Sequence, residues 1–114
     1  MATTSGVVIA TGASQSNVID IMDGVITGIT LGAWNGTEIT LLGAQRDNDT
    51  YVPVHAADGT EVSFTVAANR HVYVDPNITR GLRFVKIRSG DTAAGVNQSA
   101  QRTFTVTVER SGGA

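Results

Sequence analysis

Apolar residues recur at every second position in several short stretches of this chain, and that spacing restricts what the chain can fold into. Polar and apolar side chains alternate most clearly in residues 61–66, 71–75 and 103–109. Successive side chains of a strand point to opposite faces of its sheet, so a period of two predicts strands with one buried and one solvated face. No stretch keeps an apolar face at helical spacing for ten residues. We therefore predict a chain built from strands.

Turn dipeptides separate these strands from further apolar segments. The other segments expected as strands are Gly6–Ala10, Asn17–Ile21, Val25–Leu31, Thr37–Leu42, Thr50–His55 and Arg83–Arg88, which makes about nine short strands. The pair Asp58-Gly59 lies between Val54 and Val62 and favours a hairpin with a type I′ turn. Short strands separated by turns are typical of sandwiches and small barrels. We predict an all-β, single-domain antiparallel β-sandwich of the jelly-roll kind.

Length and local composition suggest where the domain begins and ends. A chain of 114 residues corresponds to one domain. Residues 1–6 and 111–114 are small and polar, so we expect an N-terminal arm (1–6), a β-sandwich (7–110) and a flexible C-terminal tail (111–114). An arm of this kind is disordered by itself or becomes ordered on a neighbouring molecule.

Residue types that carry catalysis or hold metals are scarce. The absence of cysteine removes a thiol nucleophile, a disulfide framework and Cys-ligated metals. The only histidines are His55 and His71, and no serine stands in a G-x-S-x-G elbow. The run Asp47–Asp49 resembles the opening of a calcium loop but lacks the glycine and the distant glutamate, so we interpret it as a turn. We expect no enzymatic activity, no cofactor and no metal site.

The charge balance indicates which partners to expect. Eight basic and ten acidic residues give a net charge of -2, which lacks the basic excess typical of nucleic-acid binding. No apolar run reaches the length of a membrane span or a secretory signal, so we expect no membrane partner. Lys86 is the only lysine among the cations. Because arginine is enriched at protein interfaces, this bias favours a protein partner.

Five cations follow one another closely in the second half of the chain. They are Arg70, Arg80, Arg83, Lys86 and Arg88. On strands they would form a cationic stripe facing an acidic partner surface. The alternative is a solvated face whose cations pair locally with Asp75 or Asp91, and the sequence leaves both open.

The single tryptophan, Trp34, precedes Asn35-Gly36 in a predicted loop. A lone tryptophan near a strand is more often a core or rim residue than a ligand contact. An exposed indole beside Asn35 would instead stack on a sugar or contact a protein. We keep Trp34 as a candidate interface residue.

The second half of the chain resembles a family of small virion proteins of tailed bacteriophages and prophages. The resembling segments are Thr37–Leu42, Asp47 with Tyr51–Val54, Asp58–Val62, Gly81–Gly90, Val96–Gln98 and Arg102–Val106, within residues 25 to 110. The most specific stretch is Lys86–Gly90 with the downstream Asn97-Gln98. The family usually has Ser-x-Asp-Gly before an aromatic residue, where this chain has Gln45–Asp49. The resemblance implies a β-sandwich on the virion surface, as a head decoration (cement) protein or a fibre component.

The leading hypothesis is a capsid decoration protein made in the host bacterial cytoplasm. It would bind the major capsid protein on the outside of the head and stabilise the shell. Its contacts would come from Arg80–Arg88, the loop around Trp34 and the N-terminal arm. Self-association, including a trimer, is compatible with the sequence. The alternatives are a carbohydrate-binding module of a head or tail fibre, with Trp34 as the stacking residue, and a tail or neck subunit.

Overall fold

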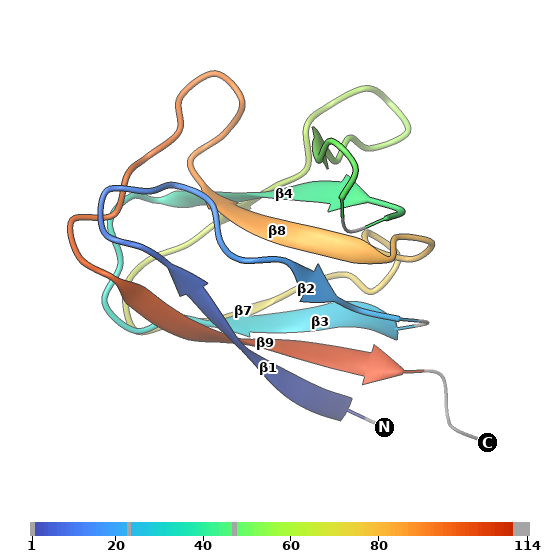
Figure 1. Ribbon diagram of the computed structural model, residues 1–114, viewed down its shortest axis with the longest axis horizontal. Coiled ribbons are helices and arrows are strands. Elements are labelled where there is room, and N and C mark those ends of the chain that lie inside the picture. The colour runs from blue at the N-terminus through green and yellow to red at the C-terminus, as the bar shows by residue number, and fades with distance from the viewer. Residues whose placement is uncertain (1, 23, 47, 111–114) are drawn as a thin grey trace.

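Two antiparallel sheets form the protein, as the computed structural model shows for residues 2–22, 24–46 and 48–110 (Figure 1). The strands of these residues are β1 (Ala2–Ile9), β2 (Ile19–Asp20), β3 (Gly24–Thr30), β4 (Glu38–Ala44), β5 (Val52–Pro53), β6 (Ser63–Thr65), β7 (His71–Tyr73), β8 (Phe84–Ser89) and β9 (Arg102–Arg110). The prediction of an all-β sandwich is confirmed. Each of the nine strands overlaps a segment that the sequence marks as a strand.

Strands from the two halves of the chain pair in a nested order. β1 pairs with β9, β2 with β8, β3 with β7, and β4 with both β5 and β6. The first sheet has the order β1-β9-β3-β7 and the second has β2-β8-β4-β5. This is the arrangement of a jelly roll, in which one long hairpin is rolled into two facing sheets. The turns that follow β2, β4 and β7 therefore lie together at one end of the sandwich.

The core lies between the two sheets and consists almost entirely of aliphatic side chains. Alternation places Val106 and Val108 of β9, Val85 of β8 and Ile39 and Leu41 of β4 on the inner faces. All five side chains are at most 1% exposed. Branched aliphatic residues favour strands because they fit the pleated surface, so the residues that form the strands also fill the core.

A β-bulge in β3 corrects the spacing of two core residues. Ile26 and Ile29 are three positions apart, which would place them on opposite faces of a regular strand. The register with β9 shifts between Ile26 and Gly28, so Thr27 is the extra residue. Both isoleucines are fully buried as a result.

The segment expected as an N-terminal arm lies in the sheet. Residues 2–6 are part of β1 and pair with residues 105–109 of β9. Backbone hydrogen bonds to a neighbouring strand do not require apolar side chains, so the Thr-Thr-Ser-Gly sequence extends the strand without an alternating pattern. The predicted C-terminal tail at 111–114 lies outside the described residues.

The hairpin at Asp58-Gly59 forms, but its turn differs from the expected type I′. Of the two residues only Gly59 has a positive φ, +89°, whereas a type I′ turn needs positive values at both. The N–H of Gly59 donates to the carbonyl of Ala56, and the N–H of Ala56 donates to the carbonyl of Thr60. This is a three-residue loop closed by a glycine bulge. The hairpin interrupts the strand opposite β4 and separates β5 from β6.

We predict that Gly90→Ala destabilises the fold much more than Gly59→Ala. Both glycines have similar positive φ values, +85° and +89°. Alanine at either position would therefore adopt a left-handed backbone conformation, which costs about 1–2 kcal/mol of stability. A Cβ at Gly90 would also clash with the carbonyl oxygen of Ala94, whereas one at Gly59 would meet nothing within 4 Å. The midpoint of urea unfolding measures the difference. Equal destabilisation by the two variants would contradict this packing at Gly90.

Candidate interaction surface

Arg88 is buried and therefore is not part of the expected cationic stripe. Its side chain is 10% exposed, and its Nη2 lies 2.7 Å from Oε2 of Glu61. The same Nη2 donates to Oγ1 of Thr92 at 2.9 Å, and its Nε donates to Oγ1 of Thr40 at 3.0 Å. These bonds tie the inserted hairpin and the loop after β8 to the outer face of the second sheet. We correct the prediction that Arg88 contacts a partner.

Glu61 completes this buried cluster and is held in its ionised form. Burial raises the pKa of Glu61, but hydrogen bonds from Thr92 and the positive charge of Arg88 outweigh it and lower the pKa overall. Thr92 donates through both its hydroxyl, at 2.6 Å, and its backbone N–H, at 3.2 Å. The pair is a structural ion pair rather than a reactive one, because every polar contact named here is internal.

Trp34 is also a structural residue. Its side chain belongs to the core, with 9% exposure, and its ring meets Phe104 edge to face with centroids 5.2 Å apart. A buried indole cannot stack on a sugar or anchor a partner, so we correct its assignment to an interface. Its Nε1 is the one buried side-chain polar atom in the described residues without a hydrogen bond.

Asn35 and Gln98 join two loops next to Trp34. The side-chain amide of Gln98 donates to the carbonyl of Asn35 and accepts from its N–H, each at 2.9 Å. Arg102 donates to Oδ1 of Asn35 at 2.8 Å. Gln98 belongs to the most specific part of the sequence pattern. It is only 1% exposed, and its hydrogen bonds hold the two loops together.

Lys86 lies over the loop that follows β4 rather than in a stripe. Its Nζ is 4.6 Å from the ring centroid of Tyr51, and the residue is half-buried. The ring stabilises the charge of the lysine through a cation–π contact. Lys86 faces the same outer side of the second sheet as Arg88, because the two are separated by two positions on β8.

Arg80 and Arg83 are the predicted candidates that remain at the surface. Arg83 binds Asp20 through two bonds, Nε to Oδ1 at 2.8 Å and Nη2 to Oδ2 at 3.2 Å. Hydrogen bonding from Arg83 lowers the pKa of Asp20, so this carboxylate stays charged. Arg80 is exposed and donates to Oδ1 of Asn77 at 3.1 Å.

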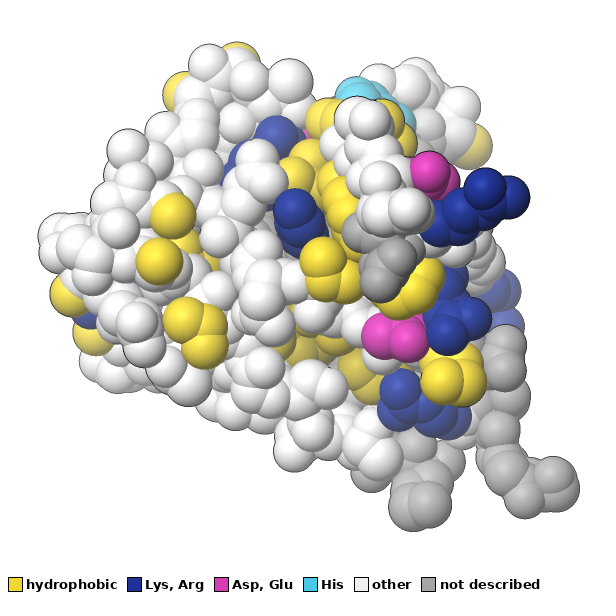
Figure 2. Space-filling view, viewed as in Figure 1, with side chains coloured by type: hydrophobic (Ala, Val, Ile, Leu, Met, Phe, Trp, Pro, Cys, Tyr) yellow, Lys and Arg dark blue, Asp and Glu magenta, His cyan; other side chains and the backbone are white. Residues whose placement is uncertain are grey.

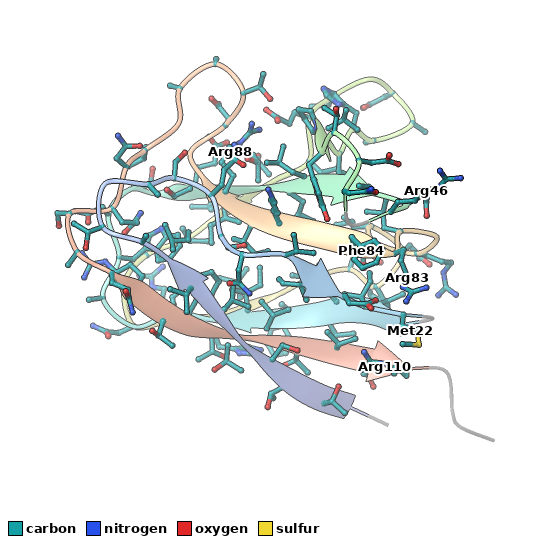
Figure 3. The ribbon with its side chains drawn as sticks, viewed as in Figure 1. Met22, Arg46, Arg83, Phe84, Arg88 and Arg110 are labelled. Atoms are coloured by element: carbon teal, nitrogen blue, oxygen red, sulfur yellow. The ribbon has the colours of Figure 1, made fainter. Side chains whose placement is uncertain are left out.

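Sequence reasoning missed two further arginines and a methionine at the same end of the sandwich. Figure 3 shows Met22, Arg46, Arg83 and Arg110 grouped around the turns after β2 and β4 and the last residue of β9. We call Met22, Arg46, Arg80, Arg83 and Arg110 the arginine end. Arg46 could have been placed near Arg83 if the antiparallel pairing of β4 with β8 had been known, because this pairing brings the end of β4 beside the start of β8.

Charge and apolar surface meet on the arginine end. Figure 2 shows most of the visible lysine and arginine side chains gathered on this side, next to hydrophobic side chains. Met22 is 48% exposed and adds an apolar side chain to this charged surface. Arg110 donates to Oγ1 of Thr3 at 2.9 Å, and Arg83 lies 5.1 Å from the ring centroid of Phe84. The guanidinium groups are thus oriented by neighbours.

A shallow hollow opens beside these arginines. It has a volume of about 320 Å³ and is lined by Gly24, Val25, Gln45, Arg80, Gly81, Leu82 and Arg83. The side-chain amide of Gln45 donates to the carbonyl of Gly81 at 2.9 Å and so fixes one wall. Arg80 and Arg83 place two guanidinium groups at this part-apolar hollow, and the carboxylate of Asp20 binds the second of them.

The described residues contain no arrangement suited to metal binding. Within 2–22, 24–46 and 48–110 no group of three His, Asp or Glu residues lies close enough to hold an ion. His71 contacts the hydroxyl of Thr30 at 2.7 Å, and His55 contacts the carbonyl of Pro53 at 3.2 Å. The same part of the chain has no helix long and apolar enough to cross a membrane.

Comparisons with known proteins give no relative for this chain. No family model, no curated protein and no solved structure matches it.

We predict that Glu61→Gln destabilises the protein by about 3 kcal/mol at neutral pH, because it leaves the guanidinium of Arg88 buried without a counter-charge. The folded pKa of Glu61 lies below its ordinary 4.5, so its contribution is complete above that pH and is lost as pH falls through the lowered value. Thermal unfolding between neutral and acid pH measures both effects. The difference between wild type and variant should shrink in acid; a constant difference would contradict the assignment.

Proposed function

We propose that this chain is a structural virion protein of a tailed bacteriophage, and that it is a capsid decoration protein which binds the major capsid protein on the outside of the head. The observation that carries the proposal is the arginine end, where Arg80 and Arg83 line a hollow and Met22 is exposed. The resemblance of residues 25–110 to small virion proteins supplies the partner class. A second location on the virion, the tail or neck, uses the same chemistry and is an outcome of the test below.

The architecture supports this proposal by analogy. Jelly rolls with nested strand pairing occur in viral capsid proteins and in lectins. Fold alone does not determine function, so the analogy only narrows the classes to be tested. In this chain motif residues 86–89 lie in β8, an inner strand of the second sheet, and Gly90 follows it. Gln98 joins two loops, so the motif residues support the scaffold.

The arginine end would bind an acidic surface of the shell through charge-assisted hydrogen bonds. Arginine presents several donors in a planar fork that matches a carboxylate, and it is less strongly hydrated than lysine. Met22 would add apolar contact at the centre of the interface. Many copies on one shell, each with a modest interface, then stabilise the head collectively.

We predict that Arg80→Glu weakens binding to undecorated heads about tenfold or more, because it replaces an attraction by a repulsion at the rim of the hollow. Arg70→Glu is the matched control, since Arg70 is exposed and precedes β7 at the opposite end of the sandwich. Co-sedimentation with purified heads, with bound copies counted by gel densitometry over a salt series, measures the affinity.

Each result of that experiment supports or opposes the proposal. Saturable binding to heads that is weakened by raised salt and by Arg80→Glu, but not by Arg70→Glu, supports it. Binding to tail fractions alone contradicts the decoration role and favours the tail or neck subunit. An equal loss of head binding in Arg80→Glu and Arg70→Glu would show that the arginine end is not the interface.

A second candidate function, sugar binding on a fibre, depends on Tyr73 rather than Trp34. The Tyr73 side chain is 84% exposed on the outer face of the first sheet, and its ring meets His71 with centroids 4.8 Å apart. An aromatic ring held in this way offers a flat face to a sugar ring.

We expect Tyr73→Ala to abolish any binding seen in a glycan screen, because Tyr73 is the one Phe, Tyr or Trp residue on β7. Tyr73→Phe is the control that keeps the stacking face. A screen without binding rejects this candidate, and binding that survives Tyr73→Ala places the site elsewhere.

A further inference from the structure

β1 is the longest edge strand in the described part of the chain, and over residues 2–6 it lacks the features that protect the other edges. β2 and β5 have two residues each and β6 and β7 have three, and β5 also contains Pro53. Short strands and proline are the usual devices that stop a sheet edge from pairing with another chain. β1 has eight residues, Ala-Thr-Thr-Ser-Gly-Val-Val-Ile, with no proline, no charge and no register shift against β9.

The hydrogen bonds of Val8 reveal which backbone groups of β1 point outward. The N–H of Val8 donates to Oδ1 of Asn17 at 2.8 Å, and the N–H of Asn17 donates to the carbonyl of Val8 at 3.2 Å. Both groups of Val8 therefore point away from β9. Residues two apart in a strand direct their backbone groups to the same side, so those of Gly6, Thr4 and Ala2 also point away from β9.

We propose that a second copy of this chain pairs with β1 in antiparallel orientation, with the two-fold axis beside Thr4. This register sets Thr4 opposite Thr4 of the second copy and Ala2 opposite Gly6, and it is the register that uses all three outward-facing residues. Shifting the second strand two residues further along would set its Ala2 against Val8, whose backbone groups already bond to Asn17. Asn17 thus closes the edge at the point where the self-complementary segment ends.

The side chains around this axis suit a two-fold contact. Thr4 and Gly6 lie on the outer face of the first sheet opposite Thr107 and Thr105 of β9, and all four residues are small. β1 holds no ionisable side chain, so no like charges meet across the axis. Pairing would join two four-stranded sheets into one continuous eight-stranded sheet of order β7-β3-β9-β1-β1-β9-β3-β7. The edge then has no open backbone groups at residues 2–6.

The test measures the mass of the untagged chain by analytical ultracentrifugation from about 1 μM to about 1 mM. We expect a reversible change from 11.9 kDa to twice that mass. Thr4→Pro removes an outward N–H that the monomer does not use for β1–β9 pairing, and it should give a monomer at every concentration. Thr4→Val keeps the N–H and should still dimerise.

Two further measurements test the β1–β1 contact independently of the proline variant. Thr4→Lys sets two ammonium groups side by side at the axis while keeping every backbone donor, so it should also be monomeric even if the proline variant fails to fold. Amide hydrogen exchange should slow at Thr4 and Gly6 as the concentration rises, and not at His71–Tyr73 on the opposite edge. A wild-type monomer at all concentrations, or a dimer that survives both Thr4→Pro and Thr4→Lys, would overturn the proposal.

Discussion

Nested pairing of early strands with late strands is the constraint on which the rest of this structure depends. Because each strand in the first half of the chain pairs with one in the second half, the connecting turns alternate between the two ends of the sandwich. The turn after β2, the loop after β4 and the segment before β8 are far apart in sequence but meet at one end. The arginine end is thus a product of topology, since its five residues come from four separate segments of the chain.

The sequence predicts the strands well because a single physical rule, burial of one face, produces the alternation. It fails where pairing is decided by the backbone or by a distant side chain. Residues 2–6 have no apolar pattern, yet they extend β1 because β9 offers them a complementary edge. Arg88 looks like a surface cation until Glu61, which follows the inserted hairpin, is placed beside it. The bulge at Thr27 depends likewise on the register with β9.

Two polar clusters hold the loops that the sheets leave uncovered. The Arg88–Glu61 pair fastens the inserted hairpin and the loop after β8 to the outer face of the second sheet. In the second cluster the side-chain amide of Gln98 donates one hydrogen bond to the backbone of Asn35 and accepts another from it. Two paired strand residues exchange hydrogen bonds in the same way. Long polar side chains therefore extend hydrogen bonding beyond the strand ladders and give the loops defined shapes in a chain that has no cysteine for disulfides.

The pairing of β1 with β9 also determines when the protein can fold. Ala2 lies opposite Glu109, so the first strand has no partner in its sheet until almost the whole described chain exists. Closing such a contact brings together residues separated by most of the chain, which makes folding slow relative to proteins with local contacts. During synthesis β1, which has no charged side chain, has no partner strand while the residues of β2 to β8 are being added. Completion of this sheet consequently has to wait until β9 has been synthesised.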